Sequence, residues 1–365
     1  MPTRRLPDRP DLTHLKHQVK DLLDDQRAAK LDACQRIREF HPRFGRATDE
    51  RITSAPFTLA DAYLTVAREY GYASWARLRA HVADPAADPL HRPHHERIQD
   101  ADFRRAVELL DDGDVEGLRD HLRAHPGVVH QRVVFEGGNY FREPTLLEFV
   151  AENPVRHDSL PPNIVEVARV VLDAGARTDP HAMDRTLGLV CSGRVARECE
   201  VQLPLIDLLC DFGAAPDGAM QAALAHGEWE AVDALLRLGA RADLPVAAAT
   251  GRVEEARELL GSADSAPRHL ALALAAQHGH AGVVALLLDA GEDPNRYNPP
   301  GAHAHSTPLH QAALAGHLEV VRLLVERGAR LDIQDIHYHG TALAWAEHGG
   351  RAEVARYLRR AAEPA

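Results

Sequence analysis

Four histidines form two His-x-His pairs near the carboxyl-terminal end of the sequence. His303 and His305 stand in the segment EDPNRYNPPGAHAHS, and His337 and His339 follow in DIHYHG. Residues i and i+2 of an extended segment point to the same side, so each pair presents two imidazoles together. Neutral imidazole is a ligand for zinc, copper and nickel. The pattern therefore predicts a site for a divalent metal ion such as zinc, with Asp335 or His310 completing or orienting it.

A second interpretation of the same segments needs no metal and no other cofactor. Histidines at loop tips often face solvent, and here they alternate with aromatic and acidic side chains that suit the recognition of a protein or another ligand. The predicted contact residues are Tyr297, Asn298, His303, His305, His310, Asp335, His337, His339 and Trp345. Both interpretations stay open at the level of the sequence.

Three glutamates are candidates for acid/base chemistry. Glu148 and Glu152 lie one helical turn apart in TLLEFVAEN, and Glu347 follows Trp345 in TALAWAEHGG. Desolvation would raise the pKa of a carboxyl group on a packed helix face, as a general acid requires. Carboxylates facing one another across a groove would suit an enzyme acting on a small molecule, such as a sugar. Alternatively, Glu347 lies on a solvent-facing terminal helix that tolerates any residue.

These residues must be positioned by short helices. Thr307 can cap a helix whose first residue is Pro308, where the missing N–H costs nothing. Gly316 permits a tight turn into a second helix, and Gly328 ends that helix in the left-handed conformation. The apolar residues cover only one face of each helix. Neighbouring copies of the pair must therefore stack to bury them.

Similar helix pairs recur along the chain. The second helix and its flanking glycines recur with the same spacing in GHAGVVALLLDAG and GEWEAVDALLRLG, and GRVEEARELLG and GGRAEVARYLRR are weaker copies. The stretch TPLHQAALAGHLEVVRLLVERGA resembles the ankyrin repeat nearly throughout. The resemblance implies an all-α solenoid of about seven to eight helix-turn-helix repeats over residues 98–365, with β-hairpin fingers at some junctions.

In position, Glu347 aligns with Ala313 and Ala276 of the preceding copies, and Glu148 stands where the motif has His310. The ankyrin resemblance implies that His310 is structural and bonds across the helix starts. We therefore predict a binding scaffold that recognises a partner through its concave face and His-rich fingers. The resemblance implies no catalysis. An enzyme or metal site on the concave face is thus the alternative function.

The remaining segments lie before the array. Residues 1–83 contain helical patterns in LTHLKHQVKDLLDDQ and FTLADAYLTVAREYGYASWARLRAHV, and they resemble the helical extension before the ankyrin repeats of many bacterial proteins. Residues 84–97 are rich in proline and histidine, which predicts a linker.

Composition bounds the partners and the compartment. A net charge of −12 argues against nucleic-acid binding, because few phosphates would be neutralised. No apolar run is long enough to span a membrane, and the first residues, MPTRRLPDRP, do not form a signal peptide. The four cysteines form no CxxC motif, which is typical of reduced thiols. We therefore expect a cytoplasmic protein that binds a protein or small molecule.

Overall fold

The structure is a computed structural model that describes residues 4, 6–7, 10–45, 47–83, 92–135 and 140–363. The chain divides into two compact units. One comprises Met1–Asp88, Glu136–Tyr140 and Asp243–Ala365, and the other comprises Pro89–Phe135 and Phe141–Ala242. The described residues form α-helices and short 3-10 helices, with no β-strand among them. The predicted all-α repeat fold is therefore confirmed.

The described residues of the amino-terminal extension form five helices. They are α1 (Leu12–Arg27), α2 (Leu31–Phe40), α3 (Asp49–Ser54), α4 (Leu59–Glu69) and α5 (Trp75–Ala83). Helix α1 packs against α4, and α2 packs against both α3 and α4. A buried ion pair joins α2 to α4: Arg36 Nε lies 2.5 Å and Nη2 lies 2.9 Å from the two carboxylate oxygens of Glu69. Both charges are thus paired inside the extension.

The predicted linker is only partly within the described residues, because residues 84–91 lie outside them. His94–Arg97 form a short 3-10 helix, η3. The ring of His94 stands edge-on to Phe135 and Phe141, at centroid distances of 4.9 and 5.3 Å. The boundaries of the predicted domains stay predictions, but the end of the linker packs on the loop that follows the first helix pair.

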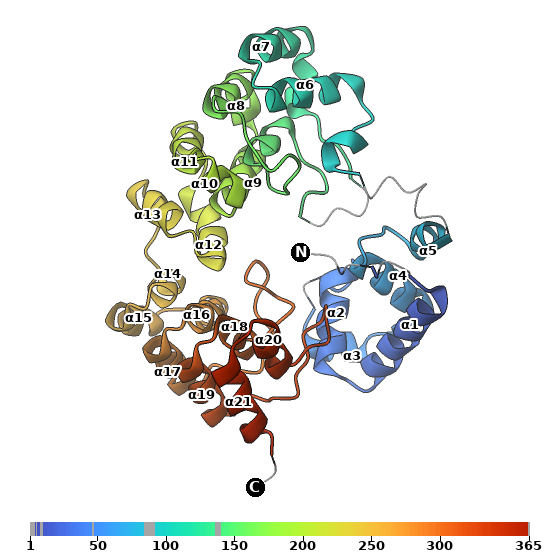
Figure 1. Cartoon of the computed structure of the whole chain (residues 1–365), viewed down its shortest axis with the longest axis vertical. Helices are drawn as coiled ribbons and strands as arrows, with labels where there is room; N and C mark the ends of the chain where they lie inside the picture. The colour runs from blue at the N-terminus through green and yellow to red at the C-terminus, as the bar shows by residue number, and fades with distance from the viewer. Residues whose placement is uncertain are drawn as a thin grey trace. The chain divides into compact units, whose positions relative to one another are not determined.

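In the unit of residues 89–242, successive helices form the early repeats (Figure 1). They are α6 (Ala101–Asp111), α7 (Val115–Ala124), η4 (Pro126–His130), η5 (Leu146–Ala151), α8 (Ile164–Asp173), η6 (Ala176–Thr178), α9 (Pro180–Cys191), α10 (Arg194–Glu198), α11 (Gln202–Asp211), α12 (Pro216–His226) and α13 (Trp229–Arg237). The first helix of one repeat is only a 3-10 helix, η5, between two long loops.

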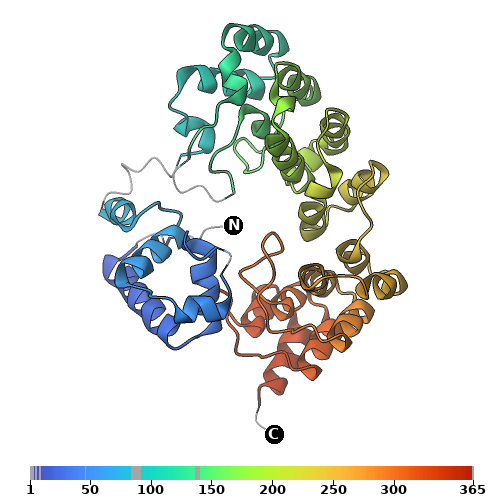
Figure 2. The same cartoon turned by 180° about the vertical axis from the view of Figure 1, so that it is seen from behind.

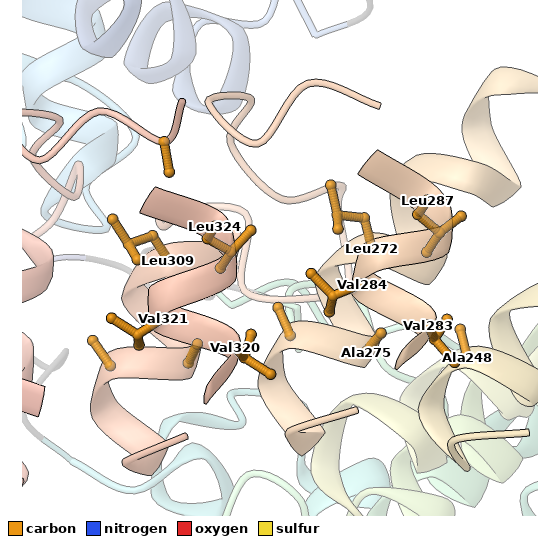
Figure 3. Close-up of a cluster of buried hydrophobic side chains, with 14 of the residues drawn as sticks. Ala248, Leu272, Ala275, Val283, Val284, Leu287, Leu309, Val320, Val321 and Leu324 are labelled. Carbon is orange, nitrogen blue, oxygen red and sulfur yellow. The ribbon is translucent and has the colours of Figure 1, made fainter. Parts of the chain in front are cut away.

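The unit with residues 243–365 holds the later repeats. Their helices are α14 (Leu244–Ala249), α15 (Val253–Leu260), α16 (Ser265–His278), α17 (Ala281–Asp289), α18 (Pro308–Ala315), α19 (Leu318–Glu326), α20 (Ala342–His348) and α21 (Ala352–Ala361). The first helices stack on one another in one row, and the second helices stack in another. Buried aliphatic side chains such as Leu272, Val284, Leu309 and Val321 fill the space between the rows (Figure 3). Stacking buries the face that a single pair leaves exposed.

Histidines tie neighbouring repeats together at the tight turns. Gly279 has φ +83°, and a Cβ atom there would meet Nδ1 of His317 at 2.6 Å. The Nε2 atom of the same His317 bonds to the carbonyl oxygen of Gln277 at 3.0 Å. Glycine is therefore needed for its backbone angle and for the close approach of the next repeat.

The two His-bearing fingers are the segments between α17 and α18 (the first finger) and between α19 and α20 (the second finger). Both are loops rather than β-hairpins, so that detail of the prediction is wrong. The first is closed by a hydrogen bond from Asn298 N to Ser306 O (2.8 Å), and the second by one from Asp335 N to Gly340 O (2.9 Å). Pro299 and Pro300 cannot donate to a ladder, and His303 has φ +60°, which breaks an extended strand. The fingers are joined by Ile336 N donating to His305 O (3.0 Å).

Helix α2 of the extension lies against both fingers, as the two views show (Figures 1 and 2). Gln35 Nε2 donates to Ala304 O at 3.2 Å. Phe40 forms a buried cluster with Tyr297, Ile333 and Ile336. The extension therefore supports the fingers and covers one side of them.

Candidate binding site at the fingers

A buried carboxylate organises the second finger. Asp335 is 0% exposed, and its oxygens accept hydrogen bonds from the backbone N–H groups of His337 (2.9 Å), Tyr338 (2.7 Å) and Gly340 (2.8 Å). They also accept one from Trp345 Nε1 at 2.9 Å. Four donors occupy the carboxylate, so the predicted contact residues Asp335 and Trp345 shape the finger from within.

His310 has the structural role that the ankyrin resemblance implies. Its Nδ1 lies 2.8 Å from Thr307 Oγ1 and accepts from Thr307 N at 3.3 Å, and its Nε2 donates to Gly340 O at 3.1 Å. Burial lowers the pKa of this imidazole, so it stays neutral. One ring thus caps α18 and fixes the base of the next finger.

The histidines of the two pairs meet face to face. The rings of His305 and His337 stack with centroids 4.7 Å apart, and His303 stands edge-on to His305 at 6.1 Å. Burial lowers the pKa of His305 to about 3 and that of His337 to about 4. The ring of His337 also lies next to that of Phe40 in α2, with the ring centroids 6.0 Å apart. These rings are therefore neutral parts of the contact between finger and α2.

Stacking does not aim the imidazole lone pairs at a common point. Metal ligation uses nitrogen lone pairs in the ring planes, which must converge at about 2 Å from the ion. Within the described ranges, no group of three or more His, Cys, Asp or Glu side chains is placed to hold a metal ion. The pKa of His339 is lowered by burial, but no ring contact joins it to the stack in this part of the chain. The metal site stays a hypothesis from the sequence.

Tyr297 and Asn298 differ in how their polar atoms are paired. Tyr297 is buried, and its hydroxyl donates to Gln334 O at 2.7 Å. Asn298 is buried as well, yet neither its Oδ1 nor its Nδ2 atom has a hydrogen-bond partner in the structure. Tyr297 therefore braces the finger, whereas Asn298 offers a free amide to a ligand.

The fingers and the extension line two open clefts. One of about 600 Å³ is lined by residues of α1, α2 and the second finger, including Arg36 and His339. The other, of about 660 Å³, is lined by residues of α2, α16 and the first finger, including Glu39, His269 and Asn298. Sequence reasoning missed Glu39 and His269, because each reads as one polar residue in an amphipathic or apolar helix.

Glu148 is a structural carboxylate in the early repeats. It lies on η5 and is 0% exposed, with Oε1 accepting from Thr145 N at 3.0 Å and Oε2 paired with Arg185 at 2.9 Å. Burial is the largest influence on its carboxyl group and raises the pKa, against the opposing effect of Arg185. Glu148 thus replaces the capping imidazole of His310 with an ion pair.

Glu152 anchors the loop that follows η5. The backbone N–H groups of Arg156, His157 and Asp158 all donate to its Oε1 atom, at 2.5 Å for Arg156 and 3.2 Å for Asp158. Its Oε2 atom pairs with Arg156 Nη2 at 2.9 Å, and Arg156 also binds Asp111 with two bonds of 2.7 and 2.8 Å. The oxygens of Glu152 are therefore occupied by the loop itself.

Of the two alternatives for Glu347, the solvent-facing one agrees with the structure. Its side chain is 47% exposed and forms an ion pair with Arg359, so it is not desolvated. Ala313, at the same position of the preceding repeat, is fully buried. Helix α20 packs on α18 and α21, and Arg359 of α21 is the residue that pairs with Glu347. Glu347 also belongs to a different unit from Glu148 and Glu152.

Comparison with known proteins identifies the family. A family model described as ankyrin repeats (3 copies) matches residues 202–335 and 297–364. Cyclin-dependent kinase inhibitor 2A of Homo sapiens is 40% identical over 123 residues, which are 33% of this chain and 76% of that protein. The chain belongs to the ankyrin-repeat proteins.

Two further relatives extend the comparison. Cyclin-dependent kinase 4 inhibitor B of Bos taurus is 38% identical over 126 residues, 33% of this ankyrin-repeat chain and 92% of that protein. Ankyrin repeat and SAM domain-containing protein 6 of Mus musculus is 45% identical over 69 residues, 19% of this chain and 8% of that protein. All three similarities are confined to a third of this ankyrin-repeat protein or less.

Proposed function

We propose that this ankyrin-repeat protein is a protein-binding scaffold whose finger surface recognises a folded partner. Two of the relatives are named as inhibitors of cyclin-dependent kinases, which supports a protein as the partner class. These relatives do not identify the partner of this chain. The region that they share with it is a repeat array, and repeat arrays bind many different partners.

One observation carries the proposal: a rigid loop presents an exposed aromatic side chain. Tyr338, at the tip of the second finger, is 75% exposed, while its backbone N–H is held by the buried Asp335. Because this hydrogen bond holds the backbone, binding orders little of the loop, and tyrosine is enriched among the residues that dominate interface energies. The motif of His337 and His339 indicated this loop in the sequence, but Tyr338 between them was not among the predicted contact residues.

The other features agree with a scaffold. The two glutamates of the early repeats, Glu148 and Glu152, are both buried and occupied by structural contacts, so they support packing rather than catalysis. The net charge of −12 favours a partner other than nucleic acid. None of the described helices is long and apolar enough to cross a bilayer. All four cysteines are free, which supports the proposed cytoplasmic compartment.

The test compares the parent chain with a Tyr338→Ser variant in affinity purification, followed by titration of each enriched protein against the purified chain. Val134, which is 75% exposed in the other unit, offers the control Val134→Ser. We expect a partner that binds the parent and the control and binds Tyr338→Ser at least about tenfold more weakly, as loss of an interface anchor implies. Equal binding by all three would overturn the finger surface as the recognition site.

A further inference from the structure

The cleft between α2 and the first finger holds polar groups that the protein itself does not pair. Its volume is about 660 Å³, within the range of small-molecule pockets. Glu39 lines it from α2, His269 from α16 and Asn298 from the finger. Both carboxyl oxygens of Glu39, the Nε2 atom of His269 and both amide atoms of Asn298 are buried without a hydrogen-bond partner. Three separate elements thus bring unpaired polar atoms to one cleft.

Such atoms are costly to leave unpaired. Buried polar groups in folded proteins nearly always have a partner, and each exception needs an explanation. His269 and Asn298 are 6% and 2% exposed, so bulk water does not hydrate them freely. A molecule bound in the cleft would supply the missing partners.

The protonation states indicate what that molecule must offer. Burial lowers the pKa of His269 to about 4, and its ring is hydrogen-bonded to the backbone of Tyr297, which leaves a neutral Nε2 as an acceptor. Burial raises the pKa of Glu39 to about 8, so at pH 7 the carboxyl group keeps its proton and can both donate and accept. Asn298 also donates and accepts. The ligand therefore needs several donors and acceptors close together.

The walls of the cleft carry no charge that calls for an ionic ligand. Arg38 pairs with Asp49 and also donates to Ala47 O at 2.8 Å. Arg296 lies 3.9 Å from Glu292, and Asp293 accepts from Asn295 N at 2.9 Å. The charged side chains already have partners within the protein. An ion entering the cleft would lose its hydration and would compete with these partners for the charged side chains.

We propose that this cleft binds a small uncharged ligand rich in hydroxyl groups, of the size of one or two sugar rings. A hydroxyl group rotates, so the same group can donate to His269 Nε2 or accept from Asn298 Nδ2. Leu31, Tyr297, Pro299 and Pro300 also line the cleft and supply apolar surface for the C–H face of such a ring. The site is separate from the exposed Tyr338 and goes beyond the proposed binding of a protein.

The test uses the full-length chain and four probes: D-glucose, maltose, trehalose and myo-inositol, titrated calorimetrically at millimolar concentrations. The variants Asn298→Leu, His269→Leu and Glu39→Leu each replace one unpaired polar group by an apolar one of similar size. Asp293→Asn is the matched control, since it lines the same cleft with a side chain that is already engaged. We expect one or more probes to bind the parent and the control and to bind each Leu variant at least tenfold more weakly.

A second measurement separates loss of the ligand from loss of the fold. An unpaired buried polar group destabilises the protein, so Asn298→Leu and Glu39→Leu should melt at or above the temperature of the parent. His269→Leu also removes the hydrogen bond of the ring to the backbone of Tyr297, so a lower melting temperature is allowed for this variant alone. Three variants on three elements keep the test open if one of them does not fold. Tyr338→Ser should leave probe binding unchanged, whatever it does to protein binding.

Three results would overturn the proposal. The first is that none of the four probes binds the parent, which would leave the polar groups to ordered water only. The second is equal binding by the parent and the Leu variants, which would place the ligand elsewhere. The third is tighter binding of N-methylacetamide than of any polyol, which would assign the cleft to an amide-bearing ligand.

Discussion

Two loops, one in each unit, are built around a buried carboxylate in similar ways. In the second finger, Asp335 accepts from three backbone N–H groups and from the indole of Trp345. In the loop after η5, Glu152 also accepts from three backbone N–H groups, and its other oxygen pairs with Arg156. The same device thus organises two loops of unrelated sequence.

The difference between them lies in how the negative charge is balanced. Asp335 relies on neutral donors, and its finger remains free to present Tyr338 to solvent. Glu152 relies on a guanidinium that is itself held by Asp111, so the loop is tied back to α6. Neutral donors suit a loop that must project, whereas a shared cation suits a loop that is fastened to the preceding repeat.

The largest expected effect comes from the charged network. Arg156→Met leaves the carboxylates of Glu152 and Asp111 without their cation. Because the side chains of Arg156 and Glu152 are almost fully buried, we expect a loss of about 3–5 kcal/mol in the free energy of unfolding. Urea denaturation of the full-length chain measures it.

The control for that variant is Arg123→Met. Arg123 pairs with Asp120, but both side chains are more than two-thirds exposed, and we expect a change within about 0.5 kcal/mol. Similar losses in the two variants would mean that the shared cation does not organise the loop.

The neutral network should be the weaker of the two. Asp335→Ala leaves three N–H groups and one indole without an acceptor, and we expect a loss of about 2–3 kcal/mol. Amide hydrogen exchange should accelerate over residues 330–345. Asp332→Ala, at an exposed position of the same finger, is the control. Unchanged exchange in Asp335→Ala would show that the finger holds its shape by packing alone.

Acid should weaken the finger more than the loop after η5. The folded pKa of His337 is lowered to about 4, so this contribution to stability is present above the ordinary value of 6.5 and is lost as the pH falls toward 4. Between pH 7 and 5 it amounts to about 2 kcal/mol.

The carboxyl group of Glu148 affects stability in the opposite direction as the pH changes. Its folded pKa is raised, so its contribution is present below the ordinary value of 4.5 and is lost as the pH rises through the folded value. Denaturation of the parent and of His337→Phe at pH 7 and 5 tests the prediction. The variant should lose about 2 kcal/mol less than the parent on acidification, and an identical loss would contradict it.

The two helix caps should differ less. Thr307→Ala removes a hydroxyl that lies 2.8 Å from His310, whereas Thr145→Ala removes one that lies 3.5 Å from Glu148. We expect a loss of about 1 kcal/mol for the first and a smaller loss for the second. The comparison needs only thermal melts of the two variants, and a reversed order would show that the charge of Glu148 strengthens the cap.

The smallest expected effect concerns metal. Because His305 and His337 are stacked, we expect zinc or a chelator to leave the melting temperature unchanged. The metal content of untagged protein purified without chelator should likewise equal that of a His303→Ala/His305→Ala variant. A stoichiometric amount of zinc in the parent, absent from the variant, would show that the fingers rearrange to hold an ion.

The helix pairs were predictable because their signals are local. Thr307, Pro308, Gly316 and Gly328 act on the backbone within one or two turns, and the structure places them as caps and turns. The role of Glu347 was not predictable, because it depends on which helix covers that face. At this position of the repeat, the side chain of Ala313 is buried, whereas that of Glu347 in the next repeat is exposed.

By itself the sequence determined the repeat: its helix starts, its turns, the stacking that its one-sided apolar faces require, and the capping imidazole of His310. The tertiary structure alone decided that α2 would cover the fingers, that His305 and His337 would stack, and that Glu39, His269 and Asn298 would share a cleft. The physical reason is that hydrogen-bond pairing and desolvation depend on neighbours in space. Some of those neighbours are far apart in the chain: Gln35 of α2 and Ala304 of the first finger, which share a hydrogen bond, are separated by 269 residues.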